Sequence, residues 1–289
     1  MITLLDGLSL GSIYALIALG YTMVYGIAKM LNFAHGDIIM VGAYAVYVSM
    51  LATKMPLVAM ISSIVICTLL GIVVEKAAYK PLRGASPLAV LITAIGVSLL
   101  LQSVAQLTFG SEAKPIPGWS LKNVQLLKDL GLSAAAVTFI ASVIIMVGLT
   151  VFINATRTGR AMLAVSEDRG AAILMGINVN RIITITFAIG SALAAFAGMF
   201  YLVSPVDLNV DPLLGALPGI KAFTAAVIGG IGSIPGAMLG GILLGVIEVF
   251  CKAVPALSPY TVALEFSLLI VILLVRPTGI LGKKRREKV

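Results

Sequence analysis

The chain has 289 residues, of which 60% are hydrophobic and only 11% charged, and its formal net charge is +8. An ordinary soluble domain has about 25% charged residues, so this composition cannot cover a water-exposed surface and excludes a soluble globular protein. The apolar runs are long and continuous, which is typical of membrane helices and not of the alternating strands of a transmembrane barrel. The composition predicts an all-α integral membrane protein, folded as a polytopic helical bundle in a lipid bilayer.

The apolar runs predict eight full-length membrane spans and one shorter segment. A helix needs about 20 residues to cross the hydrocarbon core. In chain order, the expected spans are residues 4–27, 38–53, 57–74, 88–108, 134–153, 182–204, 236–252 and 261–275. The shorter segment, 219–232, is marginal for a crossing, so the expected count is eight or nine. Residues 1–10 contain no Lys or Arg, which favours a retained first helix over a cleaved signal peptide.

The basic residues indicate which way the chain lies in the membrane. Thirteen of the 20 Lys and Arg residues fall in the segments 75–87, 154–181 and 276–289. Basic residues beside membrane spans stay in the cytoplasm, so we expect these segments and the C-terminus to be cytoplasmic, with loops 109–133 and 205–218 outside. The basic excess therefore indicates topology and not a nucleic-acid partner.

The number of crossings tests this topology. From the outer loop 205–218 to a cytoplasmic tail, the chain must cross the membrane an odd number of times. If 219–232 is a short third span, the N-terminus lies outside. If 219–232 is re-entrant instead, one of the later span assignments is wrong.

The long basic loop before the sixth full-length span carries helical signals of its own. Ser166 is expected as an N-cap, with Glu167 and Asp168 in the first turn, where the helix dipole favours negative charge. Residues 171–175 form a small apolar surface, and Gly176 is placed to end the helix in a left-handed conformation. So short a helix is not stable alone in water, and we therefore expect a partner surface to cover it.

The spacing of Glu167, Ala171, Ala172 and Gly176 resembles the EAA-type coupling loop of ABC importer permeases. In that family, a short cytoplasmic helix sits in a cleft of the ATPase subunit and transmits its closure. The resemblance implies ATPase-coupling roles for Ser166, Glu167, Asp168, Ala171, Ala172 and Gly176. From the residues alone, an ordinary amphipathic surface helix remains an alternative interpretation.

Other segments resemble one family within that class, the branched-chain amino acid permeases of the LivH type. The likeness is carried by LNFAHGD (31–37), TRTGRAML (156–163), the Gly-rich 228–248 and RPTGILGKK (276–284). It covers essentially the whole chain and implies a single transmembrane permease domain, 1–289, with a coupling loop at 154–181 and a basic tail at 276–289. It also implies import of leucine, isoleucine and valine across the bacterial plasma (inner) membrane. Urea, a short amide or another amino acid remain alternative substrates within the same importer family.

The resemblance implies several partners for the chain. These are two cytoplasmic ABC ATPase subunits, a second related permease subunit and an extracytoplasmic amino-acid-binding protein. The sequence has no GxxxxGK[ST] phosphate loop, so we expect ATP and Mg to be bound by the ATPase subunits and no cofactor by this chain. One histidine and two separated cysteines do not make a metal site. No residue is expected to be catalytic.

Two other classes of function remain as alternatives. A secondary carrier or channel would work without an ATPase, but it leaves the helical loop at 154–181 unexplained. An integral-membrane enzyme needs clustered acid, base, nucleophile or metal groups near one membrane face. One histidine and two dispersed cysteines offer little for such a cluster.

Polar residues within the apolar runs are candidates for a translocation path or gate. They are Tyr14, Tyr21, Tyr25, Asn32, His35, Asp37 and Glu265, with Thr22, Gln102 and Gln106 as further polar tips. Ionisable groups inside a membrane often mark pathways, although helix capping, a hinge or interhelical hydrogen bonds would use the same residue types. Glu248 precedes Lys252 by four residues and is expected to pair with it, whereas Glu265 has no partner visible in the sequence.

Glycines at intervals of four indicate close helix packing. Gly7 and Gly11 are one such pair, and Gly232, Gly236 and Gly240 form a series. In membranes this spacing lets two helices approach closely. Pro235 within the series favours a broken or hinged helix there.

Overall fold

The computed structural model describes residues 2–119, 133–203 and 209–282 and is all-helical apart from one short strand pair. Its described part has eight helices long and apolar enough to cross a membrane. The predicted spans correspond to α1 (Ile2–Ala28), α2 (His35–Thr53), α3 (Pro56–Val74), α4 (Pro87–Phe109), α6 (Ala134–Ala155), α9 (Val179–Tyr201), α11 (Ile234–Ala253) and α12 (Thr261–Val275). The expected short segment is α10 (Ala216–Gly229). All nine predicted apolar segments are therefore helices.

The remaining elements are short. Two helices occupy the basic loop, α7 (Arg157–Glu167) and α8 (Arg169–Leu174). Helix α3 continues into a π-helical segment (Glu75–Tyr79) and a 3-10 turn (Lys80–Leu82), and another 3-10 turn (Ser258–Tyr260) precedes α12. Strand β1 (Lys114–Pro115) pairs antiparallel with β2 (Asn209–Val210), with Lys114 opposite Val210.

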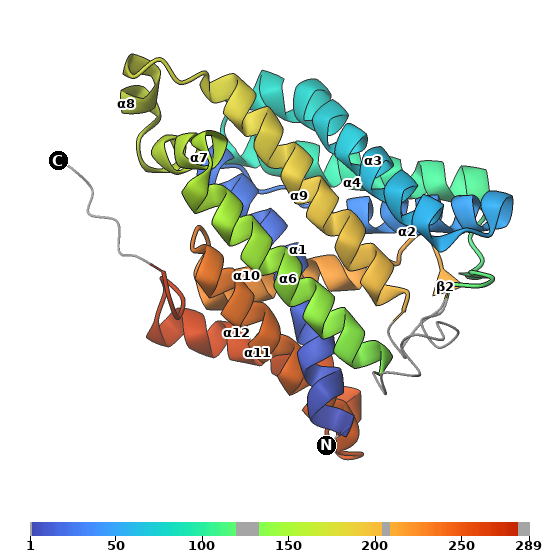
Figure 1. The fold of residues 1–289 in the computed structure, drawn as a ribbon. Helices are drawn as coiled ribbons and strands as arrows, with labels where there is room; N and C mark the ends of the chain where they lie inside the picture. The colour runs from blue at the N-terminus through green and yellow to red at the C-terminus, as the bar shows by residue number, and fades with distance from the viewer. Residues whose placement is uncertain (1, 120–132, 204–208, 283–289) are drawn as a thin grey trace.

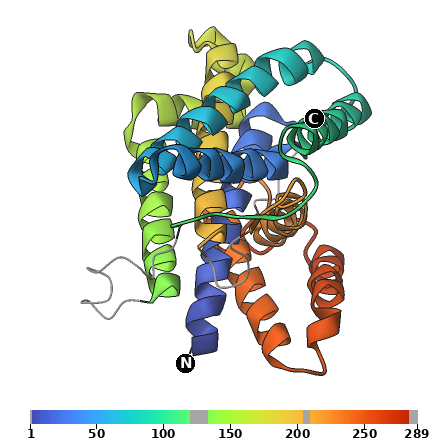
Figure 2. The same cartoon turned by 90° about the vertical axis from the view of Figure 1, so that its right-hand side faces the viewer.

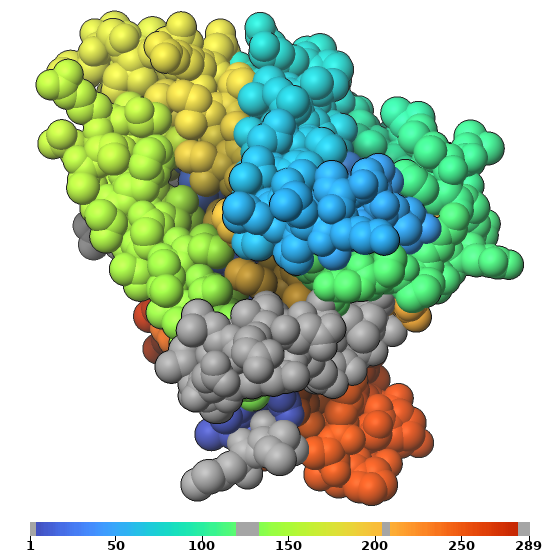
Figure 3. All heavy atoms as spheres, turned by 45° about the vertical axis from the view of Figure 1, so that its right-hand side comes forward, coloured from blue at the N-terminus to red at the C-terminus, as the bar shows by residue number. Residues whose placement is uncertain are grey.

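Helix α1 forms the centre of the bundle. It runs through the middle of the molecule and packs against α6, α9, α10 and α11 (Figures 1 and 2). Its side chains are almost all buried, whereas most of those of α4 and α12 are exposed. Exposed leucines such as Leu107 and Leu274 are natural on such outer helices, because lipid and not water surrounds them. In the space-filling view, α3 (cyan) lies against α9 (yellow) (Figure 3).

The two ends of the bundle can be told apart by their contacts. Helix α8 contacts the last turn of α1 through Arg169 and the main-chain oxygen of Ile27, and the N-terminus lies at the opposite end of the molecule (Figure 1). The segment after α12 returns beside the C-terminal end of α10, where Ile280 N–H donates to Ile228 O. Gly232 and Ile234, at the start of α11, lie beside α7. Helix α10 thus brings the chain to the end of the molecule that holds α7 and α8.

Glycines allow the central helices to approach closely. A Cβ atom on Gly245 of α11 would lie 2.1 Å from the main-chain nitrogen of Gly11 in α1, and a Cβ on Gly241 would lie 2.3 Å from the nitrogen of Ala15. Helix α10 meets α11 in the same way, since a Cβ on Gly240 would lie 2.1 Å from Ala225 O. Side chains at these positions would force the helix backbones apart.

The break near Pro235 lies before the proline and not at it. Pro235 occupies the first turn of α11, where its missing N–H has no helical partner to lose. The chain turns at Gly230 and Gly232, whose φ angles are +108° and +96°. A Cβ on Gly232 would meet nothing within 4 Å, so the turn and not close packing requires glycine there.

Candidate functional site

Two helices begin next to each other inside the bundle. The first residues of α2 and α10 meet backbone to backbone: a Cβ on Gly215 would lie 1.9 Å from the oxygen of Gly36, and one on Gly219 would lie 2.9 Å from its Cα. Gly36 lies beside Tyr21, which is in the second half of α1. These helices therefore start within the apolar bundle and not at its surface, as in transporters whose discontinuous helices form binding sites.

A cavity of about 220 Å³ adjoins this meeting point. Its polar lining comes from Asp37 of α2, Tyr21 of α1, and Ser98 and Gln102 of α4. The remaining lining residues are apolar side chains or glycines: Phe33, Gly36, Ile95, Leu99, Gly215, Ala216, Gly219 and Ile220. A concave, mostly apolar space with a few converging polar groups is the usual form of a small-molecule site.

The Asp37 carboxylate is the only carboxylate among the described residues lining this cavity. Asp37 is 2% exposed, and its Oδ1 accepts a hydrogen bond of 2.9 Å from Nε2 of Gln102. In the described part of the chain, no Lys, Arg or His nitrogen lies within 4.0 Å of it. The carboxylate is thus hydrogen-bonded but has no positive counter-charge there.

The other polar residues of the segment between the first two spans pack around the same region. The ring of His35 lies 4.8 Å from that of Tyr21 in an edge-on arrangement. A Cβ on Gly20 would lie 2.3 Å from His35 Nε2, so glycine makes room for this ring. Asn32 Oδ1 accepts a hydrogen bond of 2.8 Å from the hydroxyl of Tyr79. All three polar side chains, Asn32, His35 and Asp37, are buried.

The π-helical segment after α3 directs two polar side chains inward. Tyr79 reaches Asn32, and Glu75 binds the guanidinium of Arg83 and accepts a hydrogen bond of 2.8 Å from Thr184. Arg83 also donates to Asn180 at the start of α9. An extra residue in a helical turn rotates the following side chains, and such turns are frequent at functional sites.

A buried ionic network joins four helices. Lys221 of α10 lies 2.8 Å from Glu248 of α11 and 3.2 Å from Glu265 of α12. Glu248 also pairs with Lys252 at 2.7 Å and accepts a hydrogen bond of 2.7 Å from the hydroxyl of Tyr14 in α1. Two cations balance two anions, which is how ionisable groups persist inside a membrane.

This network bears on two expectations from the sequence, the pairing of Glu248 with Lys252 and the missing partner of Glu265. The predicted pair of Glu248 and Lys252 is present. Glu265 is 1% exposed and has Lys221 as its partner. Lys221 is 44 residues earlier in the chain and on a different helix, so no local pattern could have connected the two. The only sign of this contact in the sequence is Lys221 itself, a lone charged residue within the apolar segment 219–232.

The basic loop folds as two short helices with a sharp turn between them. The expectation that Ser166 caps the helix is wrong, because Ser166 lies in α7, where its hydroxyl donates to Leu163 O at 2.7 Å. The cap is Asp168, whose extended backbone (φ −149°, ψ 111°) starts α8 and whose Oδ1 accepts from Ala171 N–H at 3.0 Å. Gly176 has a φ of +78°, the left-handed conformation expected at the end of α8.

The end of α8 presents apolar side chains to the surroundings. Ile173, Leu174 and Met175 are 60%, 88% and 82% exposed, whereas Ala172 is buried. On a polar, basic loop, three adjacent exposed apolar side chains are typical of a surface that a partner covers.

The two-helix loop is joined to the bundle through α1. Arg169 Nη2 donates a hydrogen bond of 2.9 Å to Ile27 O near the end of α1. Partial burial, together with the nearby charge of Arg83, lowers the pKa of Arg169, although a guanidinium remains charged in proteins. The loop is thus anchored to the central helix by a charged donor.

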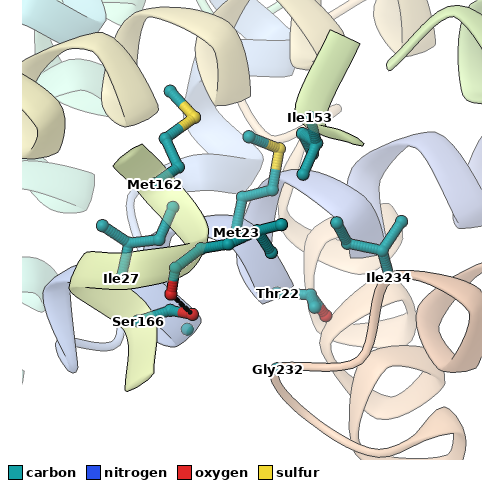
Figure 4. Close-up of a pocket in the computed structure, with 10 residues that line it drawn as sticks. Thr22, Met23, Ile27, Ile153, Met162, Ser166, Gly232 and Ile234 are labelled. Carbon is teal, nitrogen blue, oxygen red and sulfur yellow. Dashed lines mark hydrogen bonds between the residues drawn. The ribbon is translucent and has the colours of Figure 1, made fainter. Parts of the chain in front are cut away.

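A second, smaller cavity lies at the same junction. It has a volume of about 40 Å³ and lies between α1, the end of α6, α7 and the turn before α11. Met23 of α1 and Met162 of α7 approach each other there, with Ile153 and Ile234 on the other side (Figure 4).

The structure places the candidate path residues in four settings. Asp37 and Tyr21 line the larger cavity, and His35 packs against Tyr21. Asn32 lies beside it and is bound to Tyr79. Tyr14 and Glu265 belong to the ionic network. Tyr25 is half-buried in α1, close to the loop end of that helix. Gln102, one of the further polar tips, holds Asp37.

The fold and these sites define a class of protein: a multi-pass helical membrane transport protein, with helix starts and polar groups inside the bundle and an exposed helical loop at one end. Residues 3–274 match the family model "Branched-chain amino acid transport system / permease component", and the chain belongs to this family. It is therefore a multi-pass membrane permease, a transport subunit and not an enzyme.

Curated relatives agree over nearly the full length. The chain is 46% identical to the high-affinity branched-chain amino acid transport system permease protein BraD of Pseudomonas aeruginosa, covering 99% of this chain and 97% of BraD. It is 44% identical to the corresponding protein LivH of Escherichia coli K12, covering 98% and 96%. The resemblance to the LivH type seen in the sequence is thereby confirmed.

A solved structure shares the fold. PsaBC from Streptococcus pneumoniae, in complex with Fab, superposes with a TM-score of 0.52 over 94% of this chain and 91% of that chain. The two sequences are 14% identical, so the likeness concerns the fold alone.

Proposed function

We propose that the chain is the membrane-spanning subunit of an ATP-driven importer that carries leucine, isoleucine and valine across the bacterial plasma membrane. Its relatives BraD and LivH are named as permeases of high-affinity branched-chain amino acid systems, and they match this chain along almost its whole length. All of 1–289 acts as one permease domain. The bond-breaking chemistry takes place on partner subunits, which bind ATP and Mg.

The observation that carries this proposal is the geometry of the loop 154–181. Its helix α8 exposes Ile173, Leu174 and Met175, while Arg169 at the other end of α8 binds the central helix. One side of the loop is thus free to enter a cleft of an ATPase subunit, and the other transmits movement to α1. Glu167 and Asp168, both exposed, face the same partner, and Gly176 lets the chain leave the cleft.

The importer needs an energy source, a complete pathway and a means of capturing substrate, and we assign these to partner subunits. Two cytoplasmic ATPase subunits supply the driving force, a second related permease completes the pathway, and an extracytoplasmic binding protein captures the substrate. The path includes Tyr21, Asn32, His35 and Asp37, which lie at or beside the larger cavity. The paired charges of Glu265 and Lys221, with Tyr14, hold the helices beside this path in place.

The position of the basic residues and of the coupling loop gives the orientation of the chain in the membrane. The coupling loop and the C-terminal segment from 276 onward face the cytoplasm, and the N-terminus faces outward. Residues 283–289 of the basic tail lie outside the described part of the structure. A cysteine introduced at Met175, in a variant with the native cysteines replaced, should react with an impermeant maleimide in inside-out vesicles. A cysteine at Glu112 should react in right-side-out vesicles.

Affinity purification tests the assembly directly. We expect the tagged chain, extracted in mild detergent, to bring down a P-loop ATPase and a second permease. Leu174→Asp should lose the ATPase while keeping the second permease, because it places a charge in the apolar contact. Leu174→Met, which keeps the contact apolar, is the matched control. Recovery of a homo-oligomer without an ATPase, from membranes active in leucine uptake, would favour a secondary carrier or channel.

A further inference from the structure

Asp37 differs from the other buried carboxylates of this chain. Glu75, Glu248 and Glu265 each lie within 4.0 Å of an Arg or Lys nitrogen. Asp37 is buried to the same degree, but it is bound by the uncharged Gln102 amide, and among the described residues no cation lies within 4.0 Å of it. A buried carboxylate without a positive partner is unfavourable. Asp37 also lines the cavity of about 220 Å³.

The size of the cavity suits a molecule no larger than an amino acid. Its volume of about 220 Å³ is below the roughly 300–1,000 Å³ of sites that hold drug-sized ligands. Ser98 and Gln102 of α4 add polar groups to the lining, and Gln102 contacts Asp37. Ile95 and Leu99, on the same face of α4, and Ile220 of α10 add apolar lining beside these polar groups. A ligand that matches this lining has a cationic group for the carboxylate and an aliphatic part for the apolar residues.

We propose that this cavity is a recognition site for the zwitterionic amino acid during transport, with the α-ammonium group on the carboxylate of Asp37 and the aliphatic side chain against Ile95, Leu99 and Ile220. This inference rests on the proposed function and adds to it the group that recognises the substrate inside the permease. Gln102 is a positioning residue, since its amide holds Oδ1 of Asp37 at 2.9 Å.

The start of α10, which lies beside the acidic group, suits the carboxylate end of the same ligand. Gly215 and Ala216, at the start of α10, line the cavity. The first turn of a helix carries the positive end of the helix dipole, which favours a carboxylate. The site therefore distinguishes an amino acid from an aliphatic acid, which lacks the group that binds Asp37.

The test uses the complete importer, with its ATPases, second permease and binding protein, in proteoliposomes containing ATP. Leucine uptake and ATP hydrolysis stimulated by the loaded binding protein are measured together. In Asp37→Asn we expect the leucine moved per ATP hydrolysed to fall about 30-fold or more, as for the loss of one member of a buried charge pair. Stimulated ATP hydrolysis should persist, because the coupling loop is unchanged. Asp6→Asn makes the same substitution in the first turns of α1 and should match the unmodified protein.

A second variant tests the space in the cavity and leaves the charge of the Asp37 carboxylate unchanged. Leu99→Phe enlarges one of the apolar side chains that line the cavity and leaves Asp37, Ser98 and Gln102 unchanged. We expect leucine uptake to fall much more than alanine uptake, since the smaller side chain still fits. Equal loss for both substrates would show that the cavity is not the recognition site, and so would normal leucine uptake.

The outcomes separate the two proposals. If Asp37→Asn moves as much leucine per ATP hydrolysed as the unmodified protein does, the recognition site is wrong and the importer function still stands. The recognition site would also be wrong if the effect of Asp37→Asn depended on sodium or on a proton gradient, and if 4-methylpentanoate, which has no ammonium group, were transported at the same rate as leucine. Asp37 would then bind an inorganic cation. An unmodified complex that hydrolyses ATP but moves no leucine would overturn the proposed substrate itself.

Discussion

The guanidinium of Arg169, in the first turn of α8, donates a hydrogen bond of 2.9 Å to the main-chain oxygen of Ile27, near the end of α1. This oxygen belongs to one of the last carbonyls of the helix, which have no partner within it. A cation at a helix C-terminus is also favoured by the helix dipole. The bond thus joins the exposed loop to the helix at the centre of the bundle.

We expect Arg169→Ala to uncouple ATP hydrolysis from transport. A hydrogen bond from a charged group contributes about 1.5–3 kcal/mol, so leucine uptake should fall by about tenfold or more while the ATPases remain bound. The measurement is uptake and ATP hydrolysis in the same proteoliposomes. Arg181→Ala, which removes an exposed arginine at the start of α9, is the control. Equal uptake by the two variants would show that the link to Ile27 transmits nothing.

Glu167→Lys should also impair coupling, for a different reason. Glu167 is exposed at the end of α7, and reversing its charge places a cation against the basic groups expected on the ATPase. Like charges brought together at an interface cost several kcal/mol. We expect normal insertion with loss of ATPase binding in affinity purification. Glu112→Lys, in the outer loop, should bind the ATPase normally. Normal leucine uptake by Glu167→Lys would contradict the proposal that this loop couples the permease to the ATPase.

Lys221→Met should destabilise the permease strongly. It leaves Glu248 and Glu265 facing each other, with only Lys252 and Tyr14 to compensate. Removing one partner of a buried ion network costs about 3–5 kcal/mol, which should appear as a large drop in the midpoint of thermal unfolding in detergent. Adding Glu265→Gln should restore part of the loss, because the charges are then balanced again.

Lys252→Met provides the comparison for Lys221. The Lys252 side chain is 44% exposed and that of Lys221 only 7%, so the loss of Lys252 should lower the thermal midpoint less than the loss of Lys221 does. A thermal midpoint as low as that of Lys221→Met would contradict the view that burial, and not charge alone, makes Lys221 important.

Two glycine substitutions should have opposite effects on stability. In Gly245→Ala, the new Cβ would lie 2.1 Å from Gly11 N, so α11 must move away from α1 and stability should fall by about 1–3 kcal/mol. In Gly148→Ala, nothing lies within 4 Å of the new atom, and alanine favours a helix over glycine by about 1 kcal/mol. Thermal midpoints of the two purified variants check this. A destabilised Gly148→Ala with an unaffected Gly245→Ala would contradict the packing of α1 on α11.

The amino-acid sequence by itself determined the spans, the family and some local signals of the loop 154–181. Each membrane helix satisfies its own backbone hydrogen bonds and is solvated by lipid, so a run of apolar residues is enough to define it. The left-handed Gly176 and the pair of Glu248 and Lys252 depend on residues within one turn of helix. For the same reason they could be predicted without a structure.

Only the tertiary structure decided which distant residues meet. Lys221 and Glu265 come from different helices, and so do Asp37 and Gln102. The contact of Gly36 with Gly215, which places two helix starts inside the bundle, also has no local signature. Even the helix cap at Asp168 in place of Ser166 depends on a turn of the backbone between α7 and α8. Contacts between helices depend on how whole surfaces pack, and sequence periodicity within one helix does not contain that information.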